Sequence, residues 1–206
     1  MTRIHFWLDD WEHECCGDFR SVGDTISVRL QLSKDGDVEA TDDSDLVRPL
    51  GDGQMLLIGE SRESKDTEPG WIVRAHGVDV GYAGDRRGPR VRLRGEILES
   101  RHGSPDGGPP VGLVTGQIVA IAWRSNITGA VGPRQEKVVG YDPGVEVHDT
   151  NSYPGYAPPF DASELMAKLS SGAWIAQPVE HDPEDDFEIG ELGSSGWAFE
   201  FVLDVA

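Results

Sequence analysis

A chain of 206 residues is long enough for one large domain or two small ones, and it can bury a substantial core without disulfide bonds. Its formal net charge of −19 opposes binding to nucleic-acid phosphates and to anionic membranes, because both attract cationic proteins. The composition, with 26 glycines and 13 prolines, favours short strands joined by many turns over long helices.

The N-terminus does not have the form of a secretory signal. Its short apolar run is broken at once by Asp9 and Asp10, and no later stretch reaches the length of a membrane span. The two cysteines are adjacent, so they do not form a disulfide framework, and reduced thiols are expected. We therefore expect a cytoplasmic protein.

The clearest periodicity in the chain is two residues, the period of a strand with one buried face. Between Ile26 and Leu32 apolar and polar residues alternate, and turn sequences flank the segment on both sides. The same reasoning predicts further strands at 3–8, 55–59, 71–75, 90–99, 113–123, 137–141 and 197–205. Segments rich in glycine, proline and acidic residues are expected to be mobile connections, at 33–53, 60–70, 142–160 and 178–196.

One short helix is predicted near 161–171. Asp161 and Glu164 have the spacing of a capping box, an apolar stripe follows, and Gly172 supplies a stop. Closely spaced strands with a single helix predict a mainly β fold, either a small barrel or a sandwich of short antiparallel strands.

The domain organisation follows from the composition of the chain. We expect a single mainly β domain over 1–206. The stretch R-H-G-S-P-D-G-G-P-P at 101–110 is the strongest linker candidate, and it leaves open a subdivision into 1–100 and 111–206.

The first candidate site is D-W-E-H-E-C-C-G-D-F at 10–19, which holds His13, Cys15 and Cys16. Zinc sites need four convergent ligands, whereas adjacent cysteines on a strand point to opposite faces, so only His13 and Cys15 would share a face. A catalytic cysteine needs a lowered thiol pKa, and the neighbouring carboxylates act in the opposite direction. A metal or thiol site therefore stands beside a structural interpretation, in which one cysteine packs in the core near a tight turn.

The second candidate site is the basic stripe formed by Arg90, Arg92 and Arg94. Their period of two places them on one face of a strand whose other face carries Val91 and Leu93. Guanidinium groups form bidentate hydrogen bonds with phosphate or carboxylate, so the stripe is a candidate anion site. The alternative is an intramolecular role, in which the acids of a neighbouring strand around Glu200 and Asp204, or those of 182–191, pair with the arginines.

The segment at 8–24 resembles the N-terminal signature D-W-x-x-x-C-C-G-x-x-F-x-V-G-D of an uncharacterised family of actinobacterial proteins, a domain of unknown function. Phe19 falls one position earlier than the signature has it. The resemblance implies an actinobacterial source and no mechanism. The matching positions are Asp10, Trp11, Cys15, Cys16, Gly17, Val22, Gly23 and Asp24.

Three functions remain open at this point. The leading hypothesis is a non-catalytic acidic β protein that binds a basic macromolecular partner, as an inhibitor or immunity protein does, because the chain is acidic and has no phosphate-binding loop, nucleophile elbow or H-E-x-x-H pair. It requires no cofactor. The alternatives are an enzyme or redox sensor that uses zinc or a thiol at His13, Cys15 and Cys16, and a β-barrel that binds a small anion at Arg90, Arg92 and Arg94.

Overall fold

The computed structural model describes residues 1–9, 13, 18–51, 53–63, 70–83, 85, 87–100, 113–130, 136–141, 144–151 and 192–206. Within these residues it has thirteen strands in one hydrogen-bonded network, which confirms the mainly β fold. The helix predicted near 161–171 and the linker candidate 101–110 lie outside the described residues. The division into domains stays a prediction.

The strands are β1 (Thr2–Asp9), β2 (Thr25–Val28), β3 (Leu30–Leu32), β4 (Asp37–Ala40), β5 (Leu46–Gly51), β6 (Gln54–Glu63), β7 (Trp71–Ala75), β8 (Val78–Tyr82), β9 (Arg90–Glu99), β10 (Val114–Ala130), β11 (Glu136–Tyr141), β12 (Val145–Val147) and β13 (Leu192–Val205).

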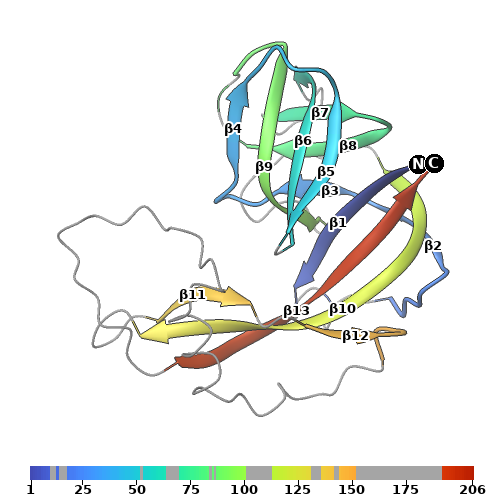
Figure 1. Cartoon of the computed structure of the whole chain (residues 1–206), viewed down its shortest axis with the longest axis vertical. Coiled ribbons are helices and arrows are strands. Elements are labelled where there is room, and N and C mark those ends of the chain that lie inside the picture. The colour runs from blue at the N-terminus through green and yellow to red at the C-terminus, as the bar shows by residue number, and fades with distance from the viewer. Residues whose placement is uncertain are drawn as a thin grey trace.

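Five of these strands close into a barrel, the upper part of Figure 1. Following the hydrogen bonds, β9 pairs with β3, β3 with β8, β8 with β7, β7 with β6, and β6 again with β9. All these pairings are antiparallel except that of β3 with β8. The barrel interior is filled by apolar side chains such as Leu57, Val80 and Leu93, each fully buried.

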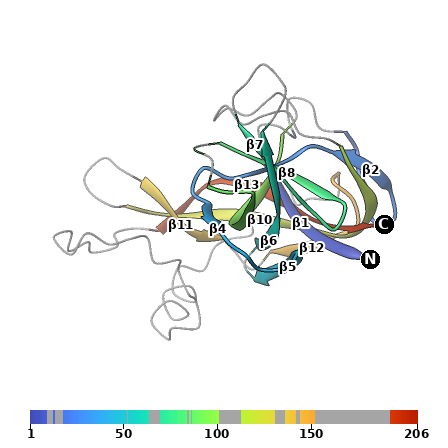
Figure 2. The same cartoon turned by 90° about the horizontal axis from the view of Figure 1, so that it is seen from above.

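A long sheet lies against the barrel and is built on β1, β13 and β10. The C-terminal strand β13 sits between the other two and pairs antiparallel with both. Thr2 lies opposite Val205, so the two chain ends lie side by side, as both Figure 1 and Figure 2 show. The buried face of this sheet is aromatic, with the rings of Phe6 and Phe201 stacked 5.2 Å apart. It joins the barrel interior in one continuous hydrophobic core.

The predicted strand at 26–32 is in fact shared between the two parts of the fold. Strand β2 pairs with β10 in the long sheet, and after Arg29 the chain continues as β3 in the barrel. The alternation in the sequence marks the buried apolar positions in both places, although Gln31 is buried too, on the other face of β3. The alternation carries no information about which sheet provides the partner strand.

Four strands lie where none was predicted. Strands β4 and β5 fall in the segment 33–53, which was expected to be a mobile connection, and β12 falls in 142–160. These strands are short or exposed at a sheet edge, so they carry no apolar alternation. The fourth, β8, follows a two-residue hairpin turn at His76 and Gly77, whose φ values of 47° and 80° fit a type I′ turn.

A buried ion pair fastens the chain before β2 to the barrel. Arg20 donates two hydrogen bonds to the carboxylate of Glu99, at 2.6 and 2.8 Å, and both side chains are less than a tenth exposed. The same guanidinium lies 5.2 Å from the ring centre of Phe201 in β13. The backbone N–H of Arg20 donates to the hydroxyl of Thr150 at 3.1 Å, and the backbone N–H of Thr150 donates to the backbone oxygen of Arg20 at 2.9 Å. One arginine therefore contacts the barrel, the long sheet and the segment that follows β12.

Replacing Glu99 with glutamine leaves the buried guanidinium of Arg20 without a full counter-charge. We expect Glu99→Gln to lower the free energy of unfolding by about 3–5 kcal/mol, measured by urea denaturation with tryptophan fluorescence. Arg3→Ala is the matched control, because Arg3 pairs with Asp204 while its side chain is 58% exposed, and exposed pairs contribute little. Equal losses for the two variants would contradict the structural role of the Arg20–Glu99 pair.

Candidate functional site

The arginine stripe of β9 has the alternation that the sequence predicts. Val91 and Leu93 are fully buried in the core, while Arg90 and Arg92 are half-buried and Arg94 is exposed on the opposite face. Strand β4 runs antiparallel beside β9, and the register places Asp37 opposite Arg94 and Glu39 opposite Arg92. Acidic residues thus line the strand next to the stripe.

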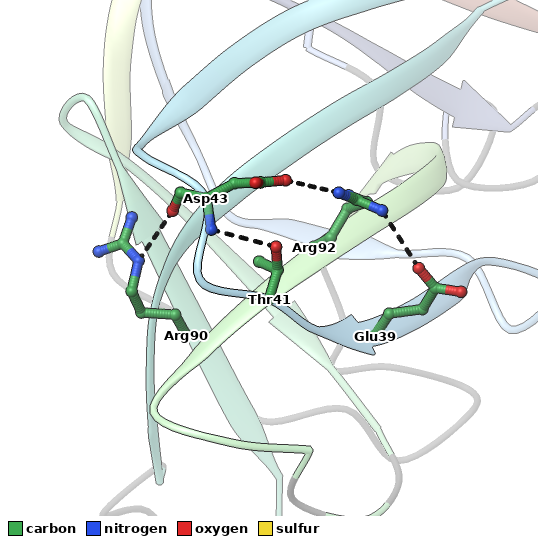
Figure 3. A network of polar contacts seen from close by, with 5 residues as sticks. All are labelled: Glu39, Thr41, Asp43, Arg90 and Arg92. Carbon is green, nitrogen blue, oxygen red and sulfur yellow. Dashed lines mark hydrogen bonds and ion pairs between the residues drawn. The ribbon is translucent and has the colours of Figure 1, made fainter.

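The first two arginines hold the connection between β4 and β5, as Figure 3 shows. Arg92 donates to the carboxylate of Asp43 at 2.5 Å and lies 3.4 Å from that of Glu39. Arg90 donates to the backbone oxygen of Asp43 at 3.1 Å and forms an ion pair with Asp45. An external anion at Arg90 or Arg92 would have to displace these carboxylates. The anion-binding hypothesis for Arg90, Arg92 and Arg94 stays a prediction.

Asp43 is the centre of this network. The hydrogen bond from Arg92, and after it that with Thr41, lower the pKa of Asp43 below its ordinary value. The backbone N–H of Asp43 donates to the hydroxyl of Thr41 at 3.2 Å, which closes a small turn. The connection is therefore fixed by local hydrogen bonds as well as by charge.

Of the acids expected to pair with the arginines, those of 182–191 lie outside the described residues. Glu200 and Asp204, the acids considered in the sequence, pair instead with His5 and Arg124 and with Arg3. The acids of β4 and its connection were overlooked because they lie in a segment expected to be a mobile connection. The intramolecular interpretation of the stripe thus describes Arg90 and Arg92, with different acids.

An acidic surface runs along β4 and its two connections, and we call it the acidic ridge. Its six carboxylates are exposed, and the stretch 34–45 that carries them holds one cation, Lys34. Among the described residues, no cation lies within ion-pair distance of Asp35, Asp37 or Asp42. The members of the acidic ridge are Asp35, Asp37, Glu39, Asp42, Asp43 and Asp45.

The first candidate site is described only in part. His13 lies edge-on against the aromatic rings of Trp197 and Phe199, at 5.6 and 5.0 Å between ring centres. Cys15 and Cys16 lie outside the described residues. Within the described ranges no three residues of the types His, Cys, Asp or Glu converge as metal ligands would. The metal and thiol hypothesis therefore stays a prediction.

Sequence reasoning missed a second charged cluster, on the face of the long sheet opposite its aromatic core. The carboxylate of Glu200 binds His5 Nδ1 at 2.8 Å and Arg124 at 2.5 Å, and the Arg124 guanidinium lies 5.5 Å from the ring centre of Trp7. Alternation along each strand places His5, Trp7 and Glu200 on one face. The register of β1 with β13 brings Glu200 beside His5, although these two residues are 195 positions apart in the chain.

Glu200 is nearly buried and ionised. Burial alone would raise its pKa, but the hydrogen bond from His5 and the charges of Arg124 and His5 outweigh it and lower the pKa below 4.5. A carboxylate with a depressed folded-state pKa stabilises the fold fully above its unfolded pKa. That stabilisation is lost as the pH falls through the folded value.

We therefore expect Glu200→Gln to be less stable than the wild type by about 3 kcal/mol at neutral pH. The difference should shrink as the pH falls below the ordinary pKa of a glutamate, and it should vanish below the lowered folded-state pKa, where the wild-type carboxyl group is neutral too. Urea denaturation at a series of pH values measures it, with Glu146→Gln as a control at an exposed strand position. A difference that stays constant into acid would refute the assigned role of Glu200.

Comparisons with known proteins identify a family but no activity. No match was found among curated proteins or among solved structures. No helix in the described part of the chain is long and apolar enough to cross a membrane. A family model matches the region that contains β1, the whole barrel and the first half of β10. That model, described as a family of unknown function (DUF6578), matches residues 2–122, more than half of the chain, so the protein belongs to this family.

Proposed function

We propose that the protein is a non-catalytic binding protein whose acidic ridge contacts a basic protein partner, as an inhibitor or immunity protein covers a cationic target. The encounter takes place in the cytoplasm and needs no cofactor. Nucleic acids and anionic membranes are not partners, because the net charge of −19 repels them.

The observation that carries the proposal is the arrangement of charge on the acidic ridge. Asp43 and Asp45 are held by Arg92 and Arg90, so the connection between β4 and β5 already has a defined conformation before a partner arrives. A site with a defined conformation loses less conformational entropy on binding. The carboxylates of Asp35, Asp37 and Asp42, which form no ion pair with any described residue, are then available to cations from outside.

The charge of the whole chain supports the same proposal in a second way. A large net negative charge accelerates the approach of a cationic partner, and complementary charges at the contact exclude wrong partners. An acidic surface also keeps a protein soluble, and charged side chains on an edge strand prevent aggregation. These two roles depend on total charge, whereas partner binding depends on where the charges lie.

A charge-reversal experiment separates position from total charge. We expect Asp35→Lys, Asp37→Lys and Asp42→Lys together to reduce the affinity for a basic partner captured from lysate at low salt by at least about ten-fold, a loss of roughly 1.4 kcal/mol. Quantitative pull-down over a salt series measures it. Binding by the wild type should itself weaken as salt rises, because the contacts are exposed ion pairs.

The matched control reverses three exposed acids outside the acidic ridge, Glu63, Asp85 and Glu146, and so changes the net charge by the same amount. This control variant should retain the wild-type affinity. Equal losses in the two variants would mean that only net charge matters. No loss in the ridge variant would place the binding surface elsewhere and refute the proposal.

A further inference from the structure

Strand β4 lies beside the barrel strand β9 and forms an edge of the sheet in the described part of the chain. It pairs antiparallel with β9, and no other strand among the described residues pairs with it. Figure 1 shows β4 at the outer margin of the barrel, beside β9. An edge of this kind presents backbone N–H and C=O groups to which another extended chain can bind.

The direction of the peptide groups of β4 follows from one hydrogen bond. The N–H of Thr41 donates to the backbone oxygen of Arg90 at 3.3 Å, so this residue pair is hydrogen-bonded. In an antiparallel ladder such pairs alternate, and the peptide groups of Glu39 and Asp37 therefore also face β9. Those of Val38 and Ala40 point away from β9, toward the open side.

The other side of β9 obeys the same alternation. Ser61 donates its N–H to the backbone oxygen of Pro89 at 2.8 Å, and the register from there pairs Gly59 with Val91. The peptide groups of odd-numbered β9 residues thus face β6. Those of even-numbered β9 residues are left for β4, in agreement with the assignment of Val38 and Ala40 to the open edge.

The side chains of β4 decide which strand the open edge accepts. Asp37 and Glu39 lie on the outer face, while Val38 packs against the core on the inner face. A second copy of β4 would bring acidic side chains next to acidic side chains, which is unfavourable. A strand with lysine or arginine at every second position would place its cations beside Asp37 and Glu39.

We infer that the outer edge of β4 binds an extended basic segment of a protein partner as an added β-strand. The backbone groups of Val38 and Ala40 form the hydrogen bonds, and the carboxylates of Asp37 and Glu39 select a strand with alternating cations. This inference rests on the proposed function and specifies how its partner binds.

Hydrogen exchange of the complete protein tests the inference residue by residue. The probe is a synthetic peptide of alternating lysine and threonine, and the control peptide has glutamate in place of lysine. At low salt we expect the lysine peptide to slow exchange of the Val38 and Ala40 amides by at least about ten-fold. The Glu39 amide, already bonded to β9, should change little, and the glutamate peptide should have no effect.

Two variants at one position supply a second readout. Ala40→Pro removes the outward N–H, and proline is tolerated at edge positions whose N–H faces solvent. Ala40→Thr keeps that N–H and serves as the control. We expect Ala40→Pro to weaken peptide binding by at least about ten-fold and Ala40→Thr to leave it unchanged, by fluorescence anisotropy, with melting temperatures recorded for both. If Ala40→Pro fails to fold, the exchange experiment on the wild type decides alone.

The outcomes separate this inference from the proposed function. Strand addition is refuted if the peptide binds in a salt-sensitive way but does not protect the Val38 and Ala40 amides. It is also refuted if Ala40→Pro binds the peptide with full affinity. Either result would leave the acidic ridge as the binding surface. Absence of binding by the alternating peptide would also refute strand addition, while the charge-reversal experiment decides on the ridge. Selection by Asp37 and Glu39 is refuted if the Val38 and Ala40 amides are protected equally at low and high salt, or equally by the lysine and the glutamate peptide.

Discussion

The rest of the structure depends on the pairing of one strand, β9. It completes the barrel by pairing with β3 and β6, supports the edge strand β4, and meets β1 of the long sheet in parallel at Trp7 and Leu98. The strand accommodates so many neighbours because it changes partner along its length. Gly95, with a φ of 151°, lies where β9 leaves β4 and turns toward β3. A side chain there would meet the backbone of Gly36 at 2.9 Å, which is why glycine is needed.

Alternation in the sequence predicted those strands whose buried face is continuous, among them β1, β7 and β9. It failed for β4 and β5, where exposure removes the apolar signal and charged residues or a proline resemble a loop. The candidate site was predictable to the same extent as the strands. The outward face of Arg90, Arg92 and Arg94 was predictable from period two, but their acidic partners were not, because ion pairs between strands depend on register and register is not encoded locally.

Charged residues have two different roles in this fold, and burial separates them. Arg20 with Glu99, and Glu200 with His5 and Arg124, have mostly buried side chains, and an uncompensated charge there would be costly. They connect parts of the chain that are far apart in sequence. The acidic ridge has the same residue types on an exposed strand, where each ion pair contributes little to stability. Its charges therefore have more effect on what approaches the protein than on whether it folds.

An acidic edge strand acts on self-association and partner choice through the same interaction. Unpaired backbone groups on β4 would attract any extended chain if its side chains were neutral. In the proposed strand addition, Asp37 and Glu39 oppose pairing with acidic strands, including β4 of another copy of the protein, because like charges would lie opposite each other. The same carboxylates lower the free energy of pairing with a strand whose cations fall at every second position. Strand addition at β4, as we propose it, therefore uses for selectivity the same charges that oppose aggregation.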